Sequence, residues 1–225
     1  MKTATKTGSK SSTKSSRSSG EGQGSTTNGM ESSGNQQQQG SQQSQPSYLQ
    51  RFFTDQLKDM YYAEKELLKG LELMKQSSTT EELEDAFEQH HKQTGRHIER
   101  LEKVFRIIGK KPEAKKCEAM EGLLREARTI IDETTEGSLT RDAALIIAAQ
   151  KIEHYEIATY GGLVQLAVTM DLDRAASILE RTLNEEEETD QLLTDIAESY
   201  VNVNAEQEGG YSWQREEMPQ LSNSF

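Results

Sequence analysis

The sequence predicts an all-α fold: an antiparallel four-helix bundle with an additional helix in the crossover connection. Apolar residues recur every three or four positions through residues 48–203, which is the spacing of one face of a helix. The same region lacks the alternation of aromatic and β-branched residues that is typical of strands. The whole chain contains only three prolines, Pro46, Pro112 and Pro219, and each stands at the edge of an expected helix.

Composition divides the 225 residues into a helical domain and two tails. Residues 1–47 are rich in Ser, Thr, Gly and Gln, and such a segment cannot bury enough apolar surface to offset its ordering entropy. We therefore expect a disordered N-terminal tail. Residues 48–203 form the expected helical domain and are long enough for a sizeable core. Residues 204–225 are polar and contain glycine, so we expect a frayed C-terminal tail.

The first two helices are expected at residues 48–75 and 80–108. Ser47 directly precedes the first apolar stripe and is a suitable N-cap. Thr80 ends a short polar loop and would cap the second helix. Gly109 follows the last apolar position of that helix and provides a C-terminal stop. The short loop predicts that the two helices form an antiparallel hairpin.

Three further helices are expected at residues 113–134, 140–170 and 172–203. Pro112 separates the first of them from the preceding hairpin, and Gly137 separates it from the next helix. The last two helices are joined by a short loop and form a second hairpin. Two helical hairpins joined by one long crossover have the connectivity of ferritin-like bundles, and here the crossover contains its own helix.

Charge and cysteine content exclude several classes of protein. The N-terminal tail carries five basic and two acidic residues, a net charge of +3. Because the whole chain has a net charge of −12, the rest of the chain has a net charge of −15. An acidic body repels nucleic acid and anionic membranes and attracts cations. Cys117 is the only cysteine, which excludes an intrachain disulfide and a thiolate metal site, and we expect it in the core. Without a long apolar run or a signal peptide, the chain is expected to be cytoplasmic, with no membrane partner.

The positive charge of the tail offers one route to nucleic acid. Basic tails contact phosphates without reading sequence. We favour a flexible solubilising linker instead, because five positive charges compete with a strongly acidic body. The residues concerned are Lys2, Lys6, Lys10, Lys14 and Arg17.

Each of the four long helices places a histidine or a carboxylate near its middle, on the face expected to be buried. The candidates are Glu64, His90, His97, Glu153, Glu156, Glu186 and Asp190. Glu64 and His97 lie 33 residues apart across one hairpin, and Glu153 and Glu186 lie 33 apart across the other. Because the helices of each hairpin are antiparallel, the equal separations predict that both pairs lie at a similar depth.

Inward carboxylates predict a metal site. A buried, unpaired carboxylate is costly, and several of them repel one another. They persist through protonation, through hydrogen bonds from groups such as tyrosine or lysine, or through a bound cation. Oxygen and imidazole donors without thiolate suit Fe or Mn, and bundles that hold two metals use inward Glu and Glu-x-x-His. We therefore expect a dinuclear Fe or Mn centre, with Tyr155 or Tyr160 bonded to its ligands.

Other interpretations remain open at single positions. Glu64 could face solvent beside Lys65, and His90 or His97 could be a hydrogen-bonded core histidine. The run at residues 185–188 should be mostly a solvated face with at most one glutamate inward. The alternative function is a metal-free interaction or structural module, in which the inward acids bond to Lys, Tyr and each other. Agreement among four helices favours the metal site.

Five segments of the chain resemble the YciE/YciF family. They are Tyr62–Leu67 (YAEKEL), Lys116–Leu123 (KCEAMEGL), Arg141–Ile146 (RDAALI), Ala149–Ala158 (AQKIEHYEIA) and Glu185–Asp190 (EEEETD). The resemblance covers about residues 48–203. It implies a ferritin-like four-helix core with an added crossover helix, an association with bacterial stress and a homodimer.

The resemblance does not bring a defined reaction, and no catalytic residue is assigned. A dinuclear centre would permit peroxide destruction or ferroxidase-type chemistry. However, Thr94 stands where a Glu-x-x-His motif ending at His97 would need its glutamate. Thr189 likewise replaces a histidine three residues after Glu186, leaving Asp190 at the next position as a substitute. These departures weigh against full ferroxidase chemistry and against an iron-storage cage.

Overall fold

The computed structural model of the protein describes residues 45–208, and within that part of the chain every regular element is helical. The elements are α1 (Tyr48–Ser77), α2 (Glu81–Ile107), α3 (Glu118–Glu133), α4 (Leu139–Thr169), α5 (Asp173–Ile196), a π-helical turn η1 (Ala197–Val201) and α6 (Asn202–Ala205). The predictions made for residues 1–44 and 209–225, including contact of the basic tail with nucleic acid, lie outside the described residues.

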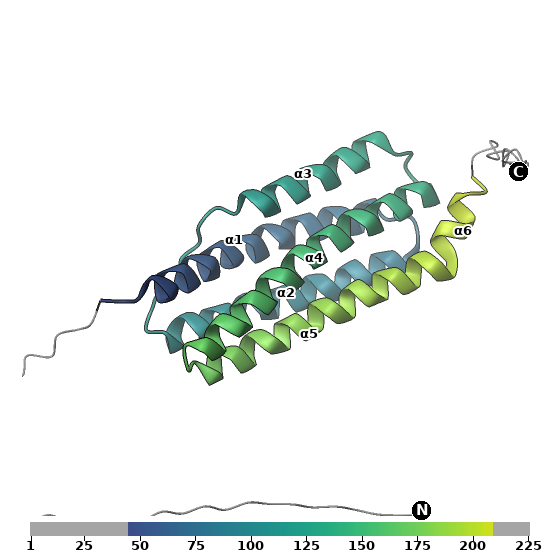
Figure 1. Ribbon diagram of the computed structural model, residues 1–225. Helices are drawn as coiled ribbons and strands as arrows, with labels where there is room; N and C mark the ends of the chain where they lie inside the picture. Colours follow the sequence, from purple (N-terminus) through teal and green to yellow (C-terminus); the bar gives the residue numbers. More distant parts are fainter. Residues whose placement is uncertain (1–44, 209–225) are drawn as a thin grey trace, which may run out of the picture. The chain divides into compact units, whose positions relative to one another are not determined.

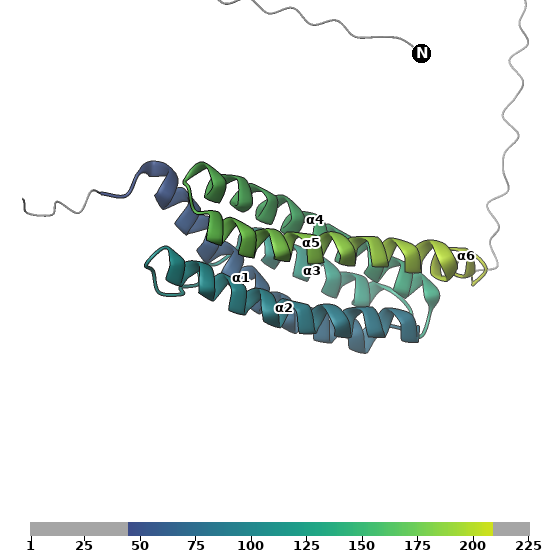
Figure 2. The same ribbon diagram turned by 90° about the horizontal axis from the view of Figure 1, so that it is seen from below.

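Four long helices form the bundle, and α3 lies along its outside (Figure 1). Helix α1 packs against α2, and α4 packs against α5, so each hairpin is a close pair. The two hairpins meet where α2 contacts α5 and where α1 contacts α4. Helix α3 crosses from the first hairpin to the second and packs on α1 and α4, as the turned view also shows (Figure 2). The predicted ferritin-like bundle with an extra crossover helix is confirmed.

The boundaries of the first hairpin follow from local capping. The predicted N-cap is confirmed, because the Ser47 hydroxyl accepts from the Gln50 amide at 3.1 Å and the Gln50 side chain accepts from the Ser47 amide at 2.8 Å. After the last turn of α2, Gly109 adopts φ +69°, a left-handed conformation that favours glycine and ends the helix.

The cap of α2 comes from a distant residue. The Thr80 side chain makes no capping bond to its own helix, contrary to expectation. Instead, the buried Asp142 carboxylate of α4 accepts from the backbone amides of Thr79 at 2.7 Å and Thr80 at 2.9 Å. The same carboxylate accepts from the Thr80 hydroxyl at 2.8 Å. One side chain therefore closes the start of α2 and ties the two hairpins together.

The crossover helix begins five residues later than predicted. The chain from 110 to 117 contains no regular structure and runs along α1, where the Lys115 amide donates to the Lys58 carbonyl at 3.0 Å. Lys115 also pairs with Asp55 at 2.8 Å. The Cys117 sulfur then accepts from the Met120 amide at 3.4 Å and caps α3. Cys117 is buried, as expected for a core residue.

The C-terminal end of the domain also differs from the expected pattern. The predicted helix over 172–203 is divided by the π-helical turn at Ala197–Val201. The chain beyond it is not frayed up to residue 208, because the Glu208 carboxylate accepts from the amides of Leu139 at 2.6 Å and Thr140 at 2.9 Å. Negative charge at a helix N-terminus is stabilising, so Glu208 completes the cap of α4.

Apolar core residues lie above and below a layer of buried polar residues halfway along the bundle, which we call the polar belt. Buried Leu57, Met60, Leu67 and Leu71 lie on both sides of the Glu64 position of α1. Each fully buried side chain of this size contributes about 1.5–3 kcal/mol relative to an exposed one. These apolar layers exclude water from the belt. No helix within residues 45–208 combines the length and apolarity needed to cross a membrane.

Candidate metal centre

Six of the seven predicted ligands meet in the middle of the bundle, each with at most 1% of its surface exposed. They form two groups, in each of which one donor atom per residue lies within 4.8 Å of the others. The first group is His90, Glu153, Glu156 and Glu186, and the second is Glu64, His97 and Glu186. All four bundle helices contribute, and Glu186 belongs to both groups. The prediction that the two 33-residue pairs lie at the same depth is confirmed, and solvent exposure of Glu64 is excluded.

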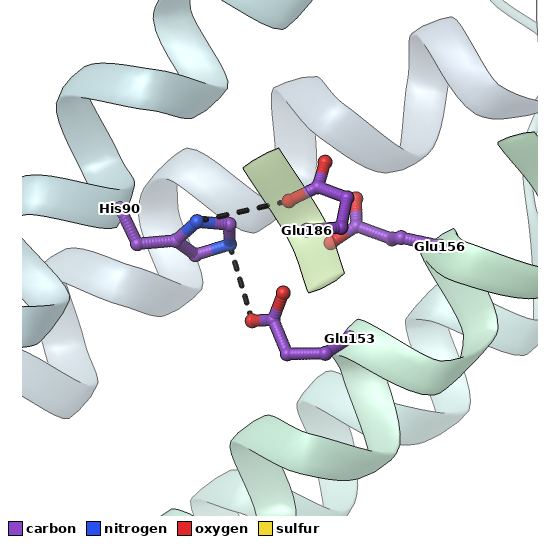
Figure 3. Close-up of side chains that lie close together, drawn as sticks. All are labelled: His90, Glu153, Glu156 and Glu186. Carbon is purple, nitrogen blue, oxygen red and sulfur yellow. Dashed lines mark ion pairs between the residues drawn. The ribbon is translucent and has the colours of Figure 1, made fainter. Parts of the chain in front are cut away.

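In the first group, three carboxylates lie on the same side of the His90 imidazole (Figure 3). His90 Nε2 lies 3.2 Å from Glu153 Oε1, and His90 Nδ1 lies 3.9 Å from Glu186 Oε2. Glu156, one turn after Glu153 on α4, faces the same space. Neither oxygen of Glu156 has a hydrogen-bond partner among residues 45–208. Three carboxylates and one histidine thus converge on one point.

The second group is built around His97. His97 Nδ1 lies 2.9 Å from Glu186 Oε1 and 3.6 Å from Glu64 Oε1. The buried Tyr160 hydroxyl donates to Glu64 Oε1, so Tyr160 is the one of the two expected tyrosines that bonds to a predicted ligand. The Tyr155 hydroxyl donates instead to Asp59 at 3.1 Å.

Asp190 does not join either group. Its side chain is 24% exposed, and Asp190 Oδ1 lies 3.3 Å from Nε2 of the exposed His154. The buried positions of α5 around Glu186 are Thr182, Thr189 and Leu193, a strict alternation of four- and three-residue steps. That alternation turns position 189 inward, and it leaves Asp190 at the seam between α4 and α5.

Glu185 is a functional candidate that the sequence did not single out. Its Oε2 lies 3.0 Å from His97 Nε2, and its Oε1 accepts from Arg100 at 2.5 Å. Burial alone would raise the pKa of Glu185, but Arg100 and His97 lower it to about 2. Glu186 is the only fully buried glutamate of the run 185–188, as expected, and Glu185 lies half-buried beside it. The sequence does contain one sign of this contact, because Arg100, one turn after His97 on α2, is a basic residue that can pair with a glutamate near His97.

Electrostatics make the two histidines unlike one another. Burial, aided by repulsion from His97, lowers the pKa of His90 to about 3, so this imidazole is neutral. Burial also disfavours the charged form of His97, but the Glu64 and Glu186 carboxylates outweigh it and raise the pKa to about 11. Without a metal, His97 is therefore the one cation at the centre of the six buried residues.

Three carboxylates of the centre have raised pKa values. Burial, followed by repulsion from Glu186, raises the pKa of both Glu153 and Glu156. Burial raises the pKa of Glu186 to about 7, although the bond and charge of His97 oppose the shift. Burial and mutual repulsion therefore make the charged forms of these three carboxylates costly.

The donor set fits a pair of metal ions. More than nine in ten buried polar groups in folded proteins have a hydrogen-bond partner. Within the described part of this chain, buried atoms without one are concentrated in the two groups: Glu64 Oε2, His90 Nε2, His97 Nδ1, Glu153 Oε2, and both oxygens of Glu156 and Glu186. All are oxygen or imidazole nitrogen, the donors that suit Fe and Mn.

This bundle, with its crossover helix and its inward carboxylates and histidines, defines a ferritin-like helical protein. The chain belongs to the family described as "Domain of unknown function (DUF892)", which matches residues 48–206. Protein YciF of Escherichia coli (strain K12) is 45% identical over 159 residues, covering 70% of this chain and 95% of YciF. The YciE/YciF resemblance is confirmed.

Solved structures agree with the family assignment. The crystal structure of the E. coli stress protein YciF matches with a TM-score of 0.66 at 44% identity, covering 70% of this chain and 99% of that one. YcfI of Rhodopseudomonas palustris matches with a TM-score of 0.64 at 34% identity, covering 68% and 96%. A protein of Xanthomonas campestris pv. campestris matches at 22% identity with a TM-score of 0.56, covering 70% and 97%, and shares the fold.

Proposed function

We propose that this protein is a YciF-like stress-protection protein that holds a dinuclear iron or manganese centre inside its bundle. The position of Glu186 carries the proposal. One of its oxygens lies 2.9 Å from His97 Nδ1, and the other lies 3.9 Å from His90 Nδ1. A single buried carboxylate whose two oxygens lie near two different histidines is suited to bridge two cations.

The two groups divide the ligands between the two ions. His90, Glu153 and Glu156 would hold the first ion and Glu64 and His97 the second, with Glu186 shared. A bound iron or manganese pair supplies redox chemistry toward peroxide or ferrous iron. The residues of the chain keep the ligands in place and exclude water. The association with stress comes from the E. coli relative, which is described as a stress protein.

Metal content tests the proposal. Protein loaded without oxygen with Mn²⁺ or Fe²⁺ and then dialysed is expected to retain two ions per chain. Glu186→Gln should lose both ions, because its carboxylate belongs to both groups. Glu187→Gln is the matched control on the adjacent, exposed position and should retain both. Less than one ion per wild-type chain, or full loading of Glu186→Gln, would contradict the proposal.

One observation favours a second candidate, a metal-free interaction or structural module. The charged His97 ring lies within 3.6 Å of both Glu64 and Glu186, and Tyr160 donates to Glu64. These contacts neutralise part of the cluster without a metal. The module predicts that a chelator leaves the melting temperature of protein purified from iron- or manganese-supplemented cells unchanged. A structural metal requires the melting temperature to fall.

A further inference from the structure

A polar pair lies at the seam of α4 and α5, beside the buried centre. His154 Nε2 and Asp190 Oδ1 are 3.3 Å apart. His154 follows Glu153 in α4, and Asp190 lies four residues, about one helical turn, after Glu186 in α5. The two partners therefore flank two predicted ligands on the same pair of helices.

Exposure decreases stepwise from the seam to the centre. The side chain of His154 is 70% exposed, that of Asp190 is 24% exposed, and that of Glu153 is 2% exposed. All three residues carry donors that bind iron or manganese. Since the ligands of the centre are themselves closed to solvent, a cation needs polar groups that replace its water before it reaches them.

Asp190 and the buried Glu153 have one feature in common. Asp190 Oδ1 and Glu153 Oε2 are both buried atoms without a hydrogen-bond partner in the described range 45–208. The 3.3 Å approach of His154 does not complete a hydrogen bond to Asp190 Oδ1. A carboxylate oxygen without a hydrogen-bond partner therefore lies at the partly exposed Asp190 and another at the buried Glu153.

Neighbouring polar groups on the same seam are already paired. The Gln150 side chain of α4 donates to the Thr194 hydroxyl of α5 at 2.9 Å. Thr194 in turn donates to the Asp190 carbonyl at 3.2 Å, which leaves the Asp190 carboxylate free to face His154. The Gln150–Thr194 hydrogen bond connects the two helices about one turn from His154, and the His154–Asp190 pair is the partly exposed polar contact beside it.

We propose that His154 and Asp190 form an access site that captures divalent cations and passes them to Glu153 and Glu186. The inference rests on the proposed function, because it requires a centre that takes up Fe²⁺ or Mn²⁺. It assigns Asp190 a part in uptake instead of the permanent ligand role that the sequence predicted. A cation on the site would lie between the two side chains in place of their direct contact.

Uptake kinetics test the access site. Co²⁺ binding to the full chain can be followed by stopped-flow absorbance, and Co²⁺ release can be followed after mixing with a chelator. In His154→Ala and Asp190→Asn, the association and release rates should both fall about tenfold, because each variant removes one of the two donors that hold the cation on its path. The dissociation constant and the stoichiometry should remain those of the wild type, since a site on the path alters both directions equally.

A matched control separates the local effect from net charge. Asp195→Asn removes the same charge from an exposed position of α5 and should leave both rates unchanged within twofold. Unchanged rates in Asp190→Asn would overturn the access site. So would a weaker dissociation constant with an unchanged association rate, which would make Asp190 a ligand of the centre. If wild-type protein binds no Co²⁺, Mn²⁺ or Fe²⁺ at all, the proposed function fails and the access site fails with it.

Discussion

His97 Nε2 lies 3.0 Å from Glu185 Oε2, and this contact fixes the imidazole from the side opposite Glu186. Arg100 holds the other oxygen of Glu185 at 2.5 Å, so the carboxylate cannot turn away without losing an ion pair. Because Nε2 donates to Glu185, Nδ1 is the atom that faces Glu64 and Glu186. Metal-binding histidines are commonly oriented by a carboxylate on the second ring nitrogen in this way.

Truncating Glu185 should therefore lower the affinity for one metal ion and leave the affinity for the other unchanged. In Glu185→Ala, we expect the ion held by Glu64 and His97 to bind about 10–100-fold less tightly. The ion held by His90, Glu153 and Glu156 should be unaffected, because none of these residues contacts Glu185. Titration calorimetry with Mn²⁺ would show two unequal binding steps in place of the wild-type curve.

A conservative variant distinguishes positioning from general destabilisation. Glu185→Gln keeps an oxygen that accepts from His97 Nε2, so it should restore most of the affinity that Glu185→Ala loses. Equal weakening of both ions in Glu185→Ala, or no rescue by glutamine, would show that Glu185 does not act through His97.

Periodicity and hairpin geometry explain how much could be predicted. A carboxylate or histidine on an apolar stripe must face the core, and equal separations in two antiparallel hairpins place the residues at one level. That reasoning located Glu64, His97, Glu153 and Glu186 correctly in the dry centre. It required only local spacing, which the sequence contains in full.

The errors come from contacts between helices that are distant in sequence. Spacing alone allowed either Thr189 or Asp190 to follow Glu186 inward, and the packing of α5 against its neighbours selected Thr189. Glu185 faces Arg100 only because α2 packs against α5. Asp142 caps α2 only because the two hairpins meet, and no local pattern around Thr80 contains that information.

Removing a buried acid should stabilise the metal-free protein. Both oxygens of Glu156 lie unpartnered in the centre, so far as the described residues extend. An unsatisfied buried polar group costs about 1–3 kcal/mol, and leucine would replace it with an apolar side chain of similar size. We expect Glu156→Leu to raise the free energy of unfolding by that amount in urea denaturation with EDTA, while metal retention falls.

The exposed substitution Glu187→Leu is the control and should change the free energy of unfolding by less than about 0.5 kcal/mol. A less stable Glu156→Leu protein would mean that the carboxyl contributes to the metal-free fold.

The stabilising effect of metal should increase with pH. The pKa of Glu186 is raised from 4.5 to about 7, so its protonated form stabilises the metal-free fold fully below about pH 4.5 and loses that effect as the pH rises through about 7. The raised pKa of His97 works in the same direction at higher pH, since its contribution is lost between 6.5 and about 11. Cations compete with the bound protons, so they bind more tightly as the protons leave.

The difference in melting temperature between Mn²⁺-loaded and EDTA-treated protein should therefore grow from pH 5 to pH 7.5. A difference that stays constant or shrinks over this interval would exclude proton competition at the centre.

The Asp142 cap should matter for stability and not for the donor set. Its carboxylate accepts three hydrogen bonds, from the amides of Thr79 and Thr80 and from the Thr80 hydroxyl, and it is completely buried. Hydrogen bonds to a charged group contribute about 1.5–3 kcal/mol, and truncation also leaves two amides at a helix start without an acceptor. We therefore expect Asp142→Ala to lower the free energy of unfolding by about 3 kcal/mol, measured by urea denaturation.

The comparison with Thr80→Val decides whether the backbone amides are the important partners. This variant removes the hydroxyl alone, so it should cost about 1 kcal/mol or less. The folded Asp142→Ala protein should still retain two Mn²⁺ ions, because Asp142 belongs to neither group of ligands. If the two variants were equally destabilised, the hydroxyl and not the helix start would be what Asp142 stabilises, and the link between the hairpins would rest on the Thr80 side chain.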